Sequence, residues 1–176
     1  MVQAGLAAAV LLSVSLGSAL PVGADELPIR KPGLWDIKIK LTGGAAPTAM
    51  MHHCTDETVD RQMSTMFNPL NPPACPKSSI LKERDHYTIE SSCSADDKLV
   101  KLHSDVSGDF QSSYTVVTDT KTQDDPDSDP TLSSMTLEGK YAGACKAGQK
   151  PGDVMLAGGL KVNIKDMDNF RKTLKR

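Results

Sequence analysis

A strict alternation of apolar and polar residues over positions 34–41 constrains the fold of this chain more than any other feature. One face of the extended segment carries Trp35, Ile37, Ile39 and Leu41, and the other carries Asp36, Lys38 and Lys40. A period of two is typical of a strand that buries one face and exposes the other to solvent. The segment therefore predicts a half-buried strand.

Further strand and turn signals follow along the chain. We expect strands over residues 48–54, 78–82, 87–92, 98–104, 110–118 and 131–141, a short helix capped by Thr55 or Asp56, and a final helix over residues 164–174. The pattern predicts a mainly β fold of about seven strands. We expect an antiparallel meander that forms a curved sheet or partly open barrel, with one or two short peripheral helices.

Residues 1–24 are predicted to be a signal peptide. The uncharged apolar run over residues 4–16 is too short for a transmembrane helix, which needs about 20 residues. Small residues precede position 25, so we expect cleavage after Ala24, although residues 1–3 lack the usual Lys or Arg. Residues 25–176 would then form a single β-rich domain in the periplasm or outside the cell, without a transmembrane segment.

Composition narrows the classes of function. The chain has 176 residues and a formal net charge of -2, which excludes a strongly basic nucleic-acid binder and an acidic disordered chain. Its aromatic residues are few, with three Phe, one Trp and three Tyr. We therefore expect a thin hydrophobic core that covalent links reinforce.

The four cysteines support export. They are Cys54, Cys75, Cys93 and Cys145. An even number without a CxxC pair or a zinc-like spacing favours two disulfides in an oxidising compartment. If residues 78–82 and 87–92 form a hairpin centred near Arg84, paired positions sum to about 168, and Cys75 faces Cys93 at disulfide reach. We therefore favour Cys75–Cys93 and Cys54–Cys145.

The run Met50, Met51, His52, His53 and Cys54 contains side chains that suit copper, particularly Cu(I). However, neighbouring strand residues point to opposite faces, so the run would divide into two sets. A disulfide would also remove Cys54 as a thiolate ligand. Copper binding through the four Met and His residues is therefore the alternative to a plain strand end.

Two other groups resemble functional motifs only in part. Asp125, Asp127 and Asp129 alternate as in a calcium loop, but Pro130 and Thr136 replace the Gly and Glu that an EF-hand needs. A solvated hairpin loop explains these carboxylates better. No GxSxG elbow is present near His86 or His103, so we assign no catalytic residue; a hydrolase of unrecognised geometry stays a third hypothesis.

The predicted C-terminal helix carries an apolar stripe and ends in basic residues. The stripe is formed by Ile164, Met167, Phe170 and Leu174. Cations at a helix C-terminus complement the helix dipole. A docking surface for a partner or an anionic membrane is the alternative.

Several segments together resemble a family of exported bacterial proteins that is known only as a domain of unknown function. They are Lys31-Pro32-Gly33-Leu34-Trp35-Asp36, Cys54-Thr55-Asp56-Glu57, the two middle cysteines, Gly143-Ala144-Cys145 and Lys150-Pro151-Gly152-Asp153. The family usually has Glu at the position of Asp36, and the acidic loop here is longer. The resemblance implies a periplasmic antiparallel β domain, and it brings no catalytic residue, ligand or cofactor.

The leading hypothesis is a non-enzymatic exported β domain. Because a curved sheet can hold a ligand in its concave face, we expect it to bind a small apolar ligand, an envelope component or a protein partner. The copper-handling protein and the hydrolase are the alternatives. The sequence implies no cofactor and no nucleic acid.

Overall fold

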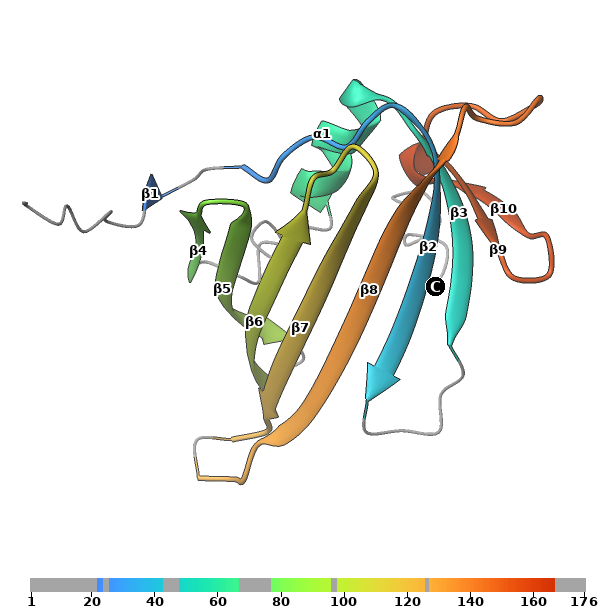
Figure 1. Ribbon diagram of the computed structural model, residues 1–176. Coiled ribbons are helices and arrows are strands. Elements are labelled where there is room, and N and C mark those ends of the chain that lie inside the picture. Colours follow the sequence, from blue (N-terminus) through green and yellow to red (C-terminus); the bar gives the residue numbers. More distant parts are fainter. Residues whose placement is uncertain are drawn as a thin grey trace, which may run out of the picture.

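The computed structural model describes residues 22–23, 26–42, 48–66, 77–95, 98–125 and 127–166. The described chain is mostly β-strand, with one α-helix and a final 3-10 turn (Figure 1). The elements are β1 (Val22–Gly23), β2 (Gly33–Thr42), β3 (Ala49–Thr55), α1 (Glu57–Met66), β4 (Lys77–Glu83), β5 (His86–Ala95), β6 (Lys98–Gly108), β7 (Ser113–Gln123), β8 (Thr131–Gly143), β9 (Asp153–Leu156), β10 (Lys161–Asn163) and the 3-10 turn Ile164–Asp166.

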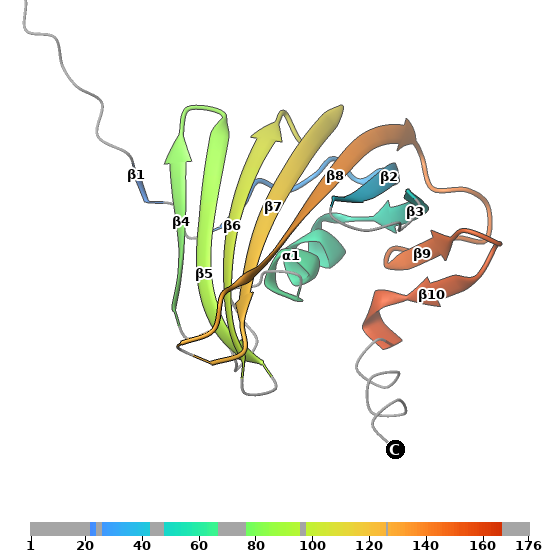
Figure 2. The ribbon, with the colours of Figure 1, turned by 90° about the horizontal axis from the view of Figure 1, so that it is seen from below.

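The strands form one antiparallel sheet in the order β1-β4-β5-β6-β7-β8-β2-β3-β9-β10. Strands β4 to β8 follow one another as a meander, and the β2–β3 hairpin joins them because β2 pairs with β8. The sheet is open and curved, with α1 on its concave side (Figure 2). The mainly β prediction and its curved-sheet alternative are confirmed, with β1, β9 and β10 in addition to the expected strands.

The alternation in the sequence sets the two faces of the sheet. Trp35 and Ile37 of β2 are buried on the concave face, whereas Asp36 and Lys38 lie on the convex face and are partly exposed. The same alternation holds for β8. Ile37 pairs with Gly139 and Ile39 pairs with Leu137, so these two β8 residues also lie on the concave face. Position along a strand therefore tells which face of the sheet a side chain occupies.

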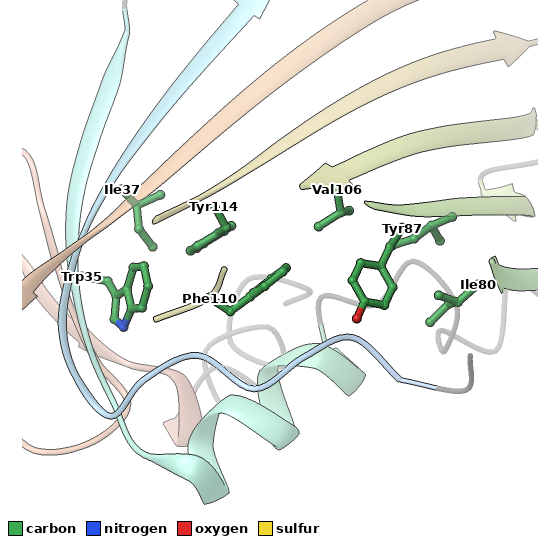
Figure 3. Packing of buried hydrophobic residues seen from close by; sticks show 8 residues of the cluster. Trp35, Ile37, Ile80, Tyr87, Val106, Phe110 and Tyr114 are labelled. Atoms are coloured by element: carbon green, nitrogen blue, oxygen red, sulfur yellow. The ribbon is translucent and has the colours of Figure 1, made fainter. Parts of the chain in front are cut away.

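The main core fills the concave face at the end of the strands near α1 (Figure 3). Its buried residues are Trp35, Ile37, Ile80, Tyr87, Ile89, Val106, Phe110 and Tyr114. The Tyr114 ring lies 5.4 Å from the Trp35 ring and stacks on Phe110 at 5.6 Å. Aromatic pairs at such distances stabilise a core by about 0.5–1.5 kcal/mol beyond their buried area. Four of the chain's few aromatic residues are therefore buried in one cluster.

The helix prediction is confirmed at α1. Asp56 accepts a hydrogen bond from the backbone N–H of Val59 at 2.7 Å, as an N-cap residue does. Val59 is fully buried and packs with Val154 and Ile164 in a second cluster. The helix expected over residues 164–174 begins instead as the 3-10 turn, and its residues after 166 lie outside the described residues.

The β4–β5 hairpin differs from the prediction by one residue. Glu83 pairs with His86, so the turn consists of Arg84 and Asp85. Arg84 has a φ of 59°, and two-residue hairpin turns require a positive φ. The predicted register was wrong because it centred the turn on Arg84 instead of between the two turn residues.

The start of β7 also differs from the prediction. We expected a strand over residues 110–118, but residues 109–112 form a loop. The Asp109 carboxylate accepts hydrogen bonds from the backbone N–H groups of residues 111–113. Phe110 has a φ of 57° and is buried in the core. Its contribution to the core therefore comes from a tight loop instead of a strand face.

The favoured disulfide between Cys54 and Cys145 is present, with a Cα–Cα distance of 5.4 Å. It links the end of β3 to the chain after β8 across the intervening strand β2. The structure thus describes one of the two expected disulfides. Cys93 is also disulfide-bonded, but Cys75 lies outside the described residues, so the pairing Cys75–Cys93 stays a prediction.

Candidate functional site

The concave face of the sheet is the candidate site, and its end near α1 is closed. The chain leading into β2 passes over the aromatic core and is held there by hydrogen bonds (Figure 3). The backbone N–H of Lys31 donates to the carbonyl oxygen of Phe110 at 2.8 Å, and Nε1 of Trp35 donates to the carbonyl oxygen of Lys31 at 2.9 Å. This segment seals the aromatic end of the concave face.

Arg30, in the same segment, lies at the centre of a buried polar cluster. Its Nε donates to Oδ1 of Asp60 on α1 at 2.7 Å, and its backbone N–H donates to Oδ2 of the same carboxylate at 2.7 Å. Its Nη1 donates to the hydroxyl of Tyr114 at 3.1 Å. Both charged side chains are less than a tenth exposed. The pair is therefore shielded from solvent. In such a buried environment the attraction between the two charges is strong, and removing either partner leaves the other charge uncompensated.

His53 completes the cluster as a neutral side chain. Its Nδ1 lies 3.3 Å from Nη2 of Arg30, which can only donate, so Nδ1 is the acceptor. Burial, followed by the nearby Arg30 charge, lowers the pKa of His53 to about 3. The Nε2–H is buried without a hydrogen-bond partner among the described residues. His53 is thus a packed part of the core.

The structure divides the Met50–Cys54 run between the two faces. Met50 and His52 lie on the convex face, Met51 and His53 lie on the concave face, and Cys54 is in the disulfide. Nδ1 of His52 lies 2.6 Å from Oδ1 of Asp36. In the described part of the chain, no group of three or more His, Cys, Asp or Glu side chains is placed to hold a metal ion. The copper alternative therefore gains no support.

In the acidic loop between β7 and β8, local hydrogen bonds form turns, and the carboxylates do not converge on one point. Oδ1 of Asp125 accepts a hydrogen bond from the backbone N–H of Asp127 at 3.0 Å, and Ser128 closes a turn on the Asp125 carbonyl. Such local bonds are typical of Asx turns. The described loop thus has the geometry of a solvated hairpin connection.

The remaining two histidines lie on the convex face among carboxylates. His86 contacts Asp105 at 3.0 Å, and His103 contacts Asp105 at 3.3 Å and Glu90 at 2.6 Å. The hydrogen bond to Glu90 is the main reason why the pKa of His103 is raised above 6.5. These contacts are exposed, and polar contacts at such exposed positions contribute little to stability individually.

At the open end of the concave face, apolar side chains continue beyond the closed core. We call this set the concave patch; it consists of Ile39, Leu41, Val116, Met135 and Leu137. Leu41 pairs with Met135, and Ile39 pairs with Leu137. Leu41 is 51% exposed, and the other four are partly buried. The concave patch therefore presents apolar surface to solvent beside the core.

Sequence patterns missed Arg30 and Asp60. Arg30 precedes the first predicted strand in a segment without periodicity, and Asp60 lies beside the buried Val59 in a helix. A charged residue next to the buried stripe of a short helix is the one signal that could have indicated a buried partner. Pairing it with Arg30 required the path of the chain before β2.

Comparison with protein families assigns the chain. A model of the family described as a protein of unknown function, DUF3617, matches residues 30–145. The chain belongs to this family. The DUF3617 match begins at Arg30 and ends at Cys145, so it includes both partners of the buried ion pair and both cysteines of the described disulfide. Strands β9 and β10 follow the matched range.

Two other comparisons add no relative. Neither the curated proteins nor the solved structures gave a match to the chain. In the described residues, no helix is long and apolar enough to cross a membrane.

Proposed function

We propose that this DUF3617 domain is an exported protein that binds a small apolar ligand at the concave patch. The observation that carries the proposal is the exposure of Leu41 on the face that otherwise buries the core. Leu41 pairs with Met135, and the neighbouring pair of Ile39 and Leu137 continues into Val116 on β7. Covering Leu41 and its neighbours with an apolar ligand would remove this surface from water.

Export is supported by the disulfide and by the predicted signal peptide. The Cys54–Cys145 bridge joins positions 91 residues apart. Disulfides of this kind persist in oxidising compartments and are rare in the cytosol. The ligand would therefore be a component of the cell envelope or of the surrounding medium.

A binding role fits the buried polar groups better than a catalytic role. Arg30, Asp60 and Tyr114 satisfy one another beneath the chain segment that covers the core. A catalytic set needs a side chain that can reach the substrate. The charged groups of this cluster bind one another and thereby stabilise the closed end of the concave face.

Fluorescence provides a direct test, because Trp35 is the single tryptophan of the chain. It is fully buried on the concave face. Titration with cis-parinaric acid, a polyene fatty acid that accepts energy from tryptophan, should quench Trp35 emission in a saturable manner. Native mass spectrometry of protein purified from its own compartment would then identify the natural ligand.

Matched variants show whether the signal comes from the concave patch. Leu41→Asp should weaken binding by about tenfold or more, because a fully buried leucine is worth about 1.5–3 kcal/mol. Leu132→Asp is the control, since Leu132 is 65% exposed on the convex face of β8. Equal binding by both variants, or an absence of saturable quenching, would contradict the proposal. Co-purification of an envelope protein without an apolar molecule would instead favour a protein partner.

A further inference from the structure

A surface hollow of about 400 Å³, open to solvent on one side and called the cavity below, lies on the convex side of the sheet, away from the concave patch. His52 of β3, Met155 of β9 and Lys161 of β10 line it. These residues form one row across β3, β9 and β10, because His52 pairs directly with Met155 and Met155 pairs directly with Lys161. Strand register, which is a property of the backbone, thus brings the three side chains to one face.

The loop after Cys145 forms the other wall of this cavity, through Lys146 and Gln149. The loop is closed by a hydrogen bond from the Gln149 N–H to the Lys146 carbonyl, and the Lys146 N–H donates to Oε1 of Gln149 at 2.8 Å. The Cys54–Cys145 disulfide attaches this loop to β3, two residues after His52. The bridge therefore holds the two walls of the cavity together.

The lining is rich in cations and hydrogen-bond donors. The Lys161 ammonium lies 3.6 Å from Oδ2 of Asp153 and 3.5 Å from the Gly148 carbonyl oxygen. The Lys146 side chain is exposed, and its ammonium forms no ion pair or hydrogen bond with the described residues. His52 is held by Asp36, and the Gln149 amide keeps its NH2 group as a donor. Asp153 and Asp36 already contact Lys161 and His52, so the Lys146 ammonium and the Gln149 NH2 group are the uncommitted donors of the lining, and they favour an anion.

The size of the cavity indicates more than an inorganic ion. Its volume of about 400 Å³ falls in the range of small-molecule sites, which typically measure about 300–1,000 Å³. Met155 adds an apolar wall next to His52. A bare phosphate would leave most of the space to water, whereas an apolar extension would contact Met155.

We propose that this cavity binds a small organic oxyanion, a carboxylate or phosphate carried on a short apolar chain. The site is distinct from the concave patch and does not depend on it. Its charged head would lie between Lys146 and Lys161, and its apolar part would lie against Met155.

The test uses the full mature protein and four probes: octyl phosphate, octanoate, inorganic phosphate and octanol. Isothermal titration should detect binding of at least one of the two amphiphilic anions, and the comparison between them distinguishes phosphate from carboxylate. Added salt should weaken this binding, because the lysines are exposed. In the Leu41→Asp variant, in which binding at the concave patch is weakened, octanol binding as tightly as the anions, or inorganic phosphate as tightly as octyl phosphate, would overturn the proposal.

Matched substitutions locate the site. Lys146→Gln should weaken binding by about threefold to fivefold, the effect expected for one exposed charge pair. His52→Gln should also weaken it, whereas Lys121→Gln, a lysine on the convex face of β7, should not. Equal affinity for all three variants, or an absence of amide chemical-shift changes over residues 146–149, would contradict the site. Leu41→Asp should leave octyl phosphate binding unchanged, which separates this site from the concave patch.

Discussion

Arg30 and Asp60 are joined by three contacts between one guanidinium, one backbone N–H and one carboxylate, and this pair fastens the chain before β2 to helix α1. Because the pair also reaches Tyr114, it connects both covering segments to the sheet. The closed end of the concave face therefore depends on a polar link that lies beneath an otherwise apolar cover.

Removing one partner of this pair should destabilise the protein strongly. Arg30→Ala leaves the Asp60 carboxylate buried without its cation, and such a loss costs about 3–5 kcal/mol. Urea unfolding measures the change. Glu138→Gln is the control, because Glu138 and Lys38 form an ion pair that is about two-fifths exposed and 3.7 Å long; its loss should cost less than about 1 kcal/mol. Similar effects of both substitutions would show that the buried pair has no special role.

The pKa of His53 predicts a loss of stability in acid. Its folded-state pKa is about 3 because of burial and Arg30, whereas an unfolded histidine titrates near 6.5. Between these values the unfolded chain binds one more proton, so stability falls as the pH falls, by up to about 1.4 kcal/mol per pH unit. Above pH 6.5 the stabilisation that comes from the neutral, buried His53 is fully present.

His53→Gln tests this linkage, because glutamine stays neutral and can still accept a hydrogen bond from Arg30. Urea unfolding between about pH 7 and pH 4 should have a shallower dependence on pH in this variant than in the wild type. The exposed histidines, such as His103, remain in both proteins, so their titration cancels in the comparison. Identical pH dependences would mean that His53 is not the group responsible.

How much of this structure the sequence predicts depends on whether a signal is local. Alternation over residues 34–41 predicted the buried face of β2, and the Asp56 cap predicted the start of α1. The hairpin register failed by one residue, because a polar run gives no sign of where a two-residue turn is centred. We expected Phe110 in a strand. Its side chain instead reaches the core from a loop residue with a positive φ, which the sequence does not reveal.

The candidate sites depend on contacts between distant segments. The run of Met and His residues correctly indicated that neighbours point to opposite faces, but not which face would be the core. His53 contacts Arg30, which lies 23 residues earlier in the chain, and the sequence does not reveal this contact. The cavity beside Lys146 requires β9 and β10 to add to the edge of β3, and these short strands have little periodicity.

Peptide mapping of the oxidised protein should recover Cys54–Cys145 and, as its complement, the predicted Cys75–Cys93. In the chain-entropy model, closing a loop of 91 residues contributes about 4–5 kcal/mol of stability as an upper value. The double variant Cys54→Ser/Cys145→Ser should therefore lose several kcal/mol in urea unfolding. Recovery of a Cys54–Cys75 peptide would contradict the assignment.

Export predicts a defined mature N-terminus. N-terminal sequencing of the protein recovered from the periplasm or medium should begin at Asp25, after cleavage behind Ala24. Strand β1 pairs Val22 and Gly23 with β4, so cleavage would remove β1 and leave β4 as the edge of the sheet. An intact mass that retains residues 1–24 in the exported protein would contradict this prediction.

The glycine at position 139 is expected to be necessary for the Tyr114 ring. Gly139 pairs with Tyr114 across β7 and β8, and an added Cβ would lie 2.1 Å from Cε1 of that ring. Gly139→Ala should therefore displace Tyr114 and weaken its contact with Arg30, at a cost of about 1–3 kcal/mol for an overpacked core. Ser133→Ala on the same strand is the control, since Ser133 is exposed. In a Tyr114→Leu background the cost of Gly139→Ala should shrink, because the clashing ring atoms are absent; an unchanged cost would show that the glycine is needed for a different reason.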